Sequence, residues 1–390
     1  MIPTVMPTYA RTEHDFVRGE GAWLIDGAGR RHLDFGAGIA VNCLGHAHPK
    51  LVAALTEQAG KLWHTSNLYR APWQEALSAR LAELTFADTM FFTNSGAEAM
   101  ECAFKAARKY QSHAGHPERV EIVVFDGNFH GRTFAGISAS GTEKMLGGFG
   151  PALPGFIRVP LDLDAVKAAV GDRTAAICIE PVQGEGGILP VERDFLRALR
   201  KIADENGALL ILDEIQCGVG RTGKLFAHEW AGVTPDIMAI AKGIGGGFPI
   251  GACLATEKAA SGMIAGTHGS TYGGNPLGCA VAMAVLEEIT APGFLDSVNR
   301  KAGLFRQKLG ALIDSHPKVF ASVRGEGLML GIKCVAPNMD MVKAGYEAGI
   351  LTVPAADNVV RVLPPLNITE EEIGEALTRL DQAASALEAS

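Results

Sequence analysis

Four short apolar runs, each the length of one strand, recur through the middle of the chain. They cover residues 120–125, 174–179, 208–212 and 236–241. Continuous apolar runs of this kind are typical of strands that are buried on both faces of a mainly parallel sheet. Helical patterns lie between them, at residues 97–110 and 191–206 among others. This alternation of strands and helices predicts an α/β sandwich.

The C-terminal part of the chain has a different pattern. Residues 275–289 and 295–315 are expected to be helical, residues 319–333 and 358–363 to form strands, and residues 369–387 to form a closing helix with a capping box. The N-terminal segment has only short strand signals and is expected to join this part. We therefore predict a large domain of residues 45–272 and a smaller α+β domain of residues 1–44 and 273–390.

Composition and charge exclude several classes of partner. The net charge is −8 with no block of like charges, so neither a nucleic acid nor an anionic membrane is expected as a partner. The seven cysteines form no CxxC pair, which favours a reducing cytoplasm and no disulfides. No signal peptide is visible, and no apolar run approaches the roughly 18 residues of a transmembrane helix.

Two of the predicted strands end in residues that carry chemistry. Lys242 follows the run 236–241 and precedes a glycine-rich bend, and Asp213 follows the run 208–212. A pyridoxal-phosphate enzyme needs this pair, because the lysine amine forms a Schiff base with the cofactor aldehyde and the aspartate holds the proton on the pyridine nitrogen. Either residue alone is a weak signal, since lysines and aspartates at strand ends are common.

Four polar or glycine-rich turns are further candidates, and each also has a simpler interpretation. Residues 94–99 open a helix and favour an anion site, or plain N-capping by one of them. In residues 127–133 an aromatic ring and an arginine suit a planar ring and a carboxylate, or the run is only a turn. Residues 180–187 bring two carboxylates to the same sheet edge or form a solvated turn. The hydroxyls of residues 268–276 suit phosphate or an N-cap.

Two other motifs are rejected. Residues 218–225 almost match a P-loop, but Leu225 stands where a serine or threonine must bind Mg²⁺. No strand leads directly into this run, so no NTPase is predicted. His46 and His48 have no further ligands at recognisable spacing, so no metal site is predicted.

Taken in order, these segments resemble the class III (ω-type) aminotransferases that use pyridoxal phosphate. The resemblance extends from residues 33–42 to residues 361–366 and so covers nearly the whole chain. It implies the aspartate-aminotransferase-like fold, fold type I. Residues 129–133, 241–251 and 269–276 are most similar to the branch that acts on N-acetylornithine. That branch transfers the δ-amino group of N2-acetyl-L-ornithine to 2-oxoglutarate in arginine biosynthesis, leaving glutamate.

The resemblance implies a role for each cofactor-facing residue. Lys242 is the catalytic lysine that carries the Schiff base and then shuttles the proton. Asp213 pairs with the pyridinium nitrogen, and Gln216 hydrogen-bonds the phenolic oxygen. Phe129 stacks on one face of the cofactor ring, and Ile215 packs on the other.

The phosphate contacts are implied in the same way. Gly96 and Ala97 donate backbone N–H groups to the phosphate. Thr271 reaches the phosphate of the neighbouring subunit's cofactor, so the resemblance implies a homodimer.

The substrate contacts involve four more residues. Arg132 and Ser270 hold the acylated end of acetylornithine. Arg361 binds the α-carboxylate of glutamate after release from Glu185. A movable ion pair of this kind offers the arginine to one substrate and hides it from the other.

Several alternatives remain open. Succinylornithine, succinyldiaminopimelate, ornithine or 4-aminobutyrate transamination uses the same cofactor residues. An aminomutase of the glutamate-semialdehyde type shares the fold but moves an amino group within one molecule. A non-catalytic binding protein is disfavoured, because Lys242, Asp213, Gln216 and Arg361 are all present.

Overall fold

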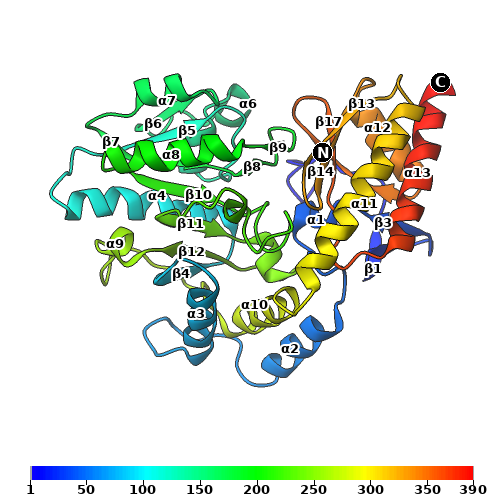
Figure 1. The fold of residues 1–390 in the computed structure, drawn as a ribbon. Helices are drawn as coiled ribbons and strands as arrows, with labels where there is room; N and C mark the ends of the chain where they lie inside the picture. Colours follow the sequence, from blue (N-terminus) through cyan, green and yellow to red (C-terminus); the bar gives the residue numbers. More distant parts are fainter. Residues whose placement is uncertain (1, 390) are drawn as a thin grey trace.

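The computed structural model describes residues 2–389 and contains a central seven-stranded sheet (Figure 1). Only β12 runs antiparallel to its neighbours β4 and β11, so the predicted mainly parallel sheet is confirmed. In spatial order the strands are β4 (Thr89–Thr93), β12 (Gly251–Ala255), β11 (Ile237–Ile240), β10 (Leu209–Asp213), β7 (Thr174–Ile179), β5 (Glu121–Phe125) and β6 (Phe156–Val159). The four apolar runs form β5, β7, β10 and β11.

Helices cover both faces of this sheet. Successive strand residues point to opposite faces, and in β5 Ile122 and Val124 pack with α4 while Val123 and Phe125 pack with α8. This two-sided burial is why the strands are continuously apolar. The helices and turns around the sheet are α4 (Gly96–His113), α5 (Phe134–Ser140), α6 (Glu143–Leu146), α7 (Leu163–Ala169), α8 (Arg193–Glu205), α9 (Glu257–Ala260), η1 (Ala227–Trp230) and η2 (Lys242–Gly245).

The N-terminal strands pair with a strand from the C-terminal part of the chain. The first small sheet has the order β1 (Phe16–Glu20), β2 (Trp23–Asp26), β3 (Arg31–Asp34) and β15 (Ile350–Leu351), and β15 lies parallel to β3. The second has the order β13 (Phe320–Glu326), β14 (Met329–Cys334), β17 (Val359–Val362) and β16 (Val353–Ala355). Helices α11 (Phe294–Ser315), α12 (Asn338–Glu347) and α13 (Glu370–Ala389) pack beside them (Figure 1).

Local signals at the helix ends also agree with the structure. The capping box of α13 is formed, because Glu372 N donates to Thr369 Oγ1 at 3.1 Å and Thr369 N donates to Glu372 Oε2 at 3.0 Å. Asn275 caps α10 (Pro276–Ile289) through Gly278 N. Strand β12 and helix α12 were not expected from the sequence pattern.

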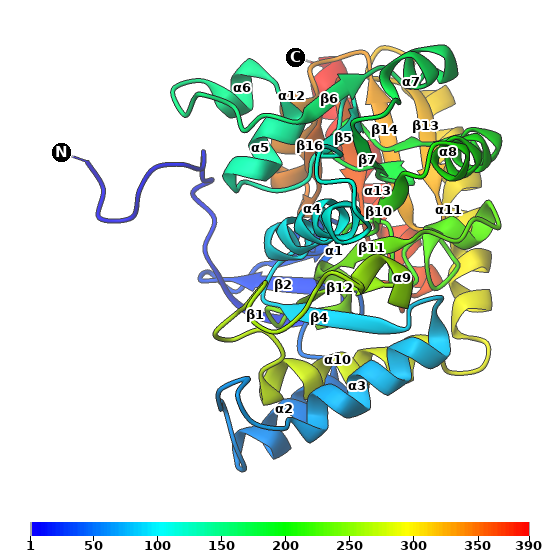
Figure 2. The ribbon, with the colours of Figure 1, turned by 90° about the vertical axis from the view of Figure 1, so that its left-hand side faces the viewer.

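Helix α10 packs against α2 (Pro49–Ala59) and α3 (Pro72–Leu84), beyond the β4 edge of the large sheet (Figures 1 and 2). The strands of the large sheet all fall within residues 89–255. The boundary after residue 272 stays a prediction. The remaining short elements are α1 (Ala37–Ala40), β8 (Val182–Gln183) and β9 (Leu189–Pro190).

Within residues 2–389, no single helix has the length and apolarity to span a membrane, and α10 with α11 meets that test only as a pair bent by 70°. All seven cysteines are buried and unpaired by disulfides.

Candidate active site

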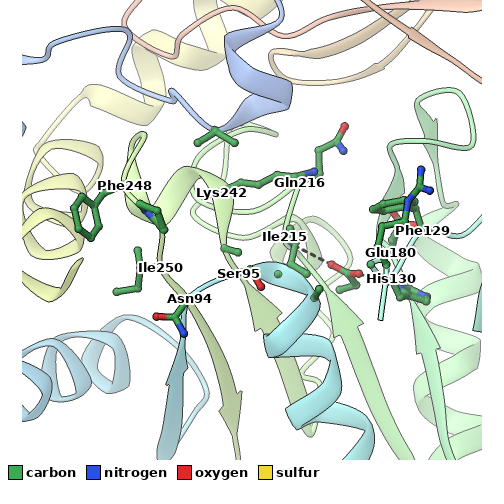
Figure 3. Close-up of a pocket in the computed structure, with 18 of the residues that line it drawn as sticks. Asn94, Ser95, Phe129, His130, Glu180, Ile215, Gln216, Lys242, Phe248 and Ile250 are labelled. Carbon is green, nitrogen blue, oxygen red and sulfur yellow. Dashed lines mark hydrogen bonds and ion pairs between the residues drawn. The ribbon is translucent and has the colours of Figure 1, made fainter. Parts of the chain in front are cut away.

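A cavity of about 400 Å³ lies where the carboxyl ends of β10 and β11 approach the start of α4. Ligands of open α/β sheets bind at this edge. Figure 3 shows Lys242 reaching into the cavity, with Phe129, His130 and Glu180 on the side opposite Asn94. The predicted residues that line the cavity are Gly96, Ala97, Phe129, Arg132, Asp213, Ile215, Gln216 and Lys242.

Lys242 begins the turn directly after β11 and has a left-handed backbone with φ of 48°. A residue with a side chain is held in this conformation at a cost of about 1–3 kcal/mol, which the surrounding packing must supply. Burial lowers the pKa of the Lys242 amine, and the Arg361 cation lowers it further, while nearby carboxylates oppose both effects. The amine is therefore deprotonated more readily than an exposed lysine.

Asp213 is buried at the end of β10 and held by two donors. Its Oδ2 lies 2.8 Å from His130 Nδ1, and its Oδ1 accepts from Ile215 N at 3.0 Å. Burial alone would lower the pKa of His130, but Cys178 and Asp213 raise it well above its ordinary value. A histidine that holds its proton donates to the carboxylate, so it keeps Asp213 oriented.

Glu180 follows β7 and fastens two loops that reach the cavity. Its carboxylate accepts from Phe129 N at 3.0 Å and from Gly184 N at 3.3 Å. Burial and the nearby Asp213 carboxylate raise the pKa of Glu180 to about 7, against the effect of His130 and the two N–H donors. One carboxyl group therefore sets the positions of Phe129 and of the loop that carries Glu185.

The start of α4 has a capping contact and two backbone N–H groups without an intrahelical partner. Ser95 Oγ accepts from Glu98 N at 3.3 Å, so the capping interpretation is confirmed. The N–H groups of Gly96 and Ala97 precede the first intrahelical hydrogen bond and are available to an anion, which the helix dipole also favours. Gly96 leaves room for its neighbour, because a Cβ there would lie 2.8 Å from Ile215 Cδ1.

The two residues predicted to face a planar ring both line the cavity. Phe129 and Ile215 come from different strand ends, after β5 and β10. The guanidinium of Arg132 lies over the Phe129 ring, 5.6 Å from its centroid, and lines the same cavity. An aromatic face and a cation are thus available at one wall.

Arg361 and Glu185 form an ion pair beside the cavity. Arg361 lies on β17, is only 2% exposed, and donates to Glu185 Oε1 at 2.6 Å. It also donates to Pro354 O at 3.0 Å and contacts Gln216 Oε1 at 3.4 Å. Gln216 lines the cavity, so the pair is one side chain away from it.

Ser270 and Thr271 line a second cavity of about 350 Å³ on the other side of Asn94. Ser270 Oγ accepts from Asn94 Nδ2 at 3.2 Å and from Gly273 N at 2.9 Å. Thr271 is exposed. Within one chain these two residues are therefore separated from the cavity that Lys242 enters.

Comparison with known proteins places the chain. The family profile "Aminotransferase class-III" matches residues 5–384. The chain belongs to the class III aminotransferases. It is 65% identical over 389 residues to acetylornithine aminotransferase of Rhodobacter capsulatus, covering 100% of this chain and 99% of that protein. As a member of this family, the protein is a pyridoxal-phosphate-dependent transaminase.

Solved structures agree on the fold of this aminotransferase. N-acetylornithine aminotransferase from Stenotrophomonas maltophilia K279a superposes with a TM-score of 0.86 at 39% identity, covering 98% of each chain. Ornithine aminotransferase from Toxoplasma gondii ME49 superposes with a TM-score of 0.95 at 34% identity, covering 99% of this chain and 93% of that chain. The predicted fold type is confirmed.

Two residues of this aminotransferase's cavity had no predicted role. His130 lies within the run 127–133, and Glu180 was expected only to be a carboxylate at the same sheet edge as Glu185. Their contacts with Asp213 and with Phe129 N join segments that are 83 and 51 residues apart. Glu180 directly follows β7 and His130 lies five residues after β5, so their positions indicated the correct sheet edge but not their partners.

Proposed function

We propose that this aminotransferase transfers the δ-amino group of N2-acetyl-L-ornithine to 2-oxoglutarate, as a cytoplasmic step of arginine biosynthesis. The observation that carries the reaction type is one cavity lined by Lys242, Asp213 and the N-terminus of α4. The substrate rests on 65% identity to a relative named acetylornithine aminotransferase over the whole chain.

The cavity fits pyridoxal phosphate by the chemistry of its donor set. The N–H groups of Gly96 and Ala97 would hold the phosphate, Asp213 the ring nitrogen, and Gln216 the phenolic oxygen. The side chains of Phe129 and Ile215 would cover the two ring faces. When bound, the cofactor supplies an electron sink for the carbon that loses its proton.

Lys242 is assigned two tasks, cofactor attachment and proton transfer. A base at neutral pH must spend part of its time unprotonated, and burial beside the Arg361 cation lowers the pKa of Lys242 in that direction. Asp213, oriented by His130, keeps a proton on the ring nitrogen because a buried carboxylate favours the cationic form of its partner.

The two substrates are assigned different arginines. Arg132 lines the cavity and would bind the carboxylate of acetylornithine. Ser270 lies outside the cavity of its own chain, so it would reach the acylated end only in the site of a partner subunit. Arg361 would bind the α-carboxylate of glutamate once Glu185 releases it. A cation that is covered by a partly exposed carboxylate suits a site that must accept substrates of two shapes.

We further propose a homodimer in which Thr271 contacts the cofactor phosphate of the partner subunit. Its exposure and its separation from the cavity of its own chain support this assignment. Mixing Lys242→Ala subunits with Thr271→Val subunits should restore activity, because one site of each hybrid then has both residues. Mixtures that are no more active than the separate variants would refute the shared site.

The first test of the whole proposal is the visible absorption of the purified holoenzyme. Addition of N-acetylornithine should bleach the cofactor band, and 2-oxoglutarate should restore it. Faster bleaching by ornithine, succinylornithine or 4-aminobutyrate would show that the proposed substrate is wrong and that the proposed reaction type still holds. Turnover without any 2-oxo acid would identify an aminomutase instead.

A further inference from the structure

Arg221 is a buried cation in the glycine-rich run that resembled a P-loop. It is only 2% exposed. Its guanidinium donates to two main-chain carbonyls, Leu328 O at 3.2 Å and Pro364 O at 2.5 Å. Burial lowers the pKa of Arg221 to about 10, so the side chain remains charged at neutral pH. Burying a cation that has no carboxylate partner costs free energy, so the two carbonyl contacts are needed to offset part of that cost.

The two carbonyls belong to the ends of neighbouring strands. Leu328 directly precedes β14, and Pro364 follows β17. These strands are antiparallel, with Leu330 opposite Val362 and Gly331 opposite Arg361. The guanidinium therefore joins β14 and β17 at the end of the sheet where Arg361 lies.

The backbone around Arg221 is tied to the cofactor-facing segment of the large domain. Gly218 N donates to Glu214 O at 3.0 Å, and Arg221 N donates to Gly218 O at 3.3 Å. Leu328 N donates back to Arg221 O at 3.0 Å. The chain that leaves Asp213 is thus connected by successive hydrogen bonds to the strand pair that carries Arg361.

The main chain beside Arg221 approaches the main chain before β14 so closely that only a glycine fits at residue 327. Gly327 has φ of 56°, and a Cβ there would collide with the backbone of Thr222. The contact is therefore main chain against main chain, with no flexible side chain between that would absorb a displacement.

We propose that Arg221 is a positioning residue for Arg361: it fixes the ends of β14 and β17 to the segment that follows Asp213. This inference rests on the proposed function, in which Arg361 binds the carboxylate of glutamate. Arg361 contacts Glu185 and Gln216 at 2.6 and 3.4 Å, so a small shift of β17 changes how it meets a substrate. Arg221 itself contacts no substrate.

The test measures the two half-reactions of the holoenzyme separately, by the cofactor absorption. Arg221→Met should raise the glutamate concentration needed for half-maximal conversion by about 10- to 100-fold, since misplacement of a binding group by about 1 Å has effects of this size. The requirement for N-acetylornithine should stay unchanged. Arg108→Met is the matched control, because Arg108 also donates to two carbonyls, Val120 O at 2.8 Å and Pro154 O at 3.1 Å, away from the cavity.

A double-mutant cycle separates this inference from the function on which it rests. Arg361→Met alone should raise the glutamate requirement, and Arg221→Met should add little in that background, because both changes act through one contact. If Arg361→Met has no effect on glutamate, the proposed role of Arg361 fails. If Arg361→Met is selective and Arg221→Met is not, only the role of Arg221 fails.

A second variant tests the proposal if Arg221→Met does not fold. Should Arg221→Met fail to fold, Arg221→Lys keeps the charge, but its shorter side chain and tetrahedral ammonium do not reproduce the position from which Arg221 Nη1 donates to both carbonyls. It should show the same selective loss for glutamate. Equal loss for both substrates, or no loss, would overturn the proposal.

Discussion

The ion pair between Glu185 and Arg361 makes the sharpest prediction, because its removal should help one substrate and hinder the other. Glu185→Gln removes the charge and keeps the shape. The pair has a 2.6 Å contact, with Arg361 buried and the Glu185 side chain 36% exposed. A hydrogen bond between charged groups contributes about 1.5–3 kcal/mol, and partial exposure favours the lower end of that range.

This free energy opposes glutamate, which must displace Glu185 to reach Arg361. Without the pair, the glutamate concentration for half-maximal conversion should fall by about tenfold, which corresponds to about 1.4 kcal/mol. The half-reaction with N-acetylornithine should become slower, because an uncovered cation then stands beside its apolar chain. Both half-reactions are followed by the absorption of the cofactor.

A matched control distinguishes this effect from general loss of an ion pair. Glu121→Gln breaks a contact of 2.8 Å with Arg173 at the amino end of β5, on the opposite edge of the sheet from the cavity. It should leave both half-reactions unchanged. If Glu185→Gln shifts the two substrates in the same direction, or shifts neither, the gating argument is refuted.

Three further outcomes are expected. Lys242→Ala should abolish turnover, and retained activity would remove the mechanism. Gly96→Ala places a Cβ 2.8 Å from Ile215 Cδ1 and should destabilise the holoenzyme by about 1–3 kcal/mol in thermal unfolding; Ile215→Ala in the same chain should recover much of this, and simple additivity would contradict the packing argument. Burial tends to lower the pKa of His228, but its 2.7 Å contact with Glu214 raises it. The contact therefore stabilises the folded protein fully below about pH 6.5, and this contribution is lost as pH rises through the folded pKa. The fall in melting temperature above about pH 6.5 should be weaker in His228→Asn, and an identical slope in both proteins would contradict this role of His228.

The large sheet was predictable because burial on both faces leaves a local trace. Residues 175–179 are apolar at every position since both sides of β7 are covered. Strand β12 is equally buried, yet its sequence Gly251-Ala-Cys-Leu-Ala255 has small residues and no strong strand signal. Its antiparallel insertion between β4 and β11 follows from packing, not from local preference.

The same distinction applies to the site. Lys242 and Asp213 were recognisable because each follows a buried strand, and the carboxyl ends of parallel strands share one edge. The contact between His130 and Asp213, and the grip of Arg221 on Leu328 and Pro364, join segments 83 to 143 residues apart. Strand periodicity reports which residues are buried, whereas the partner of a buried polar group depends on sheet order and on how the domains pack. The pair Lys242 and Asp213 could therefore be predicted as a site from the chain alone, whereas the groups that hold it in place became visible only in the fold.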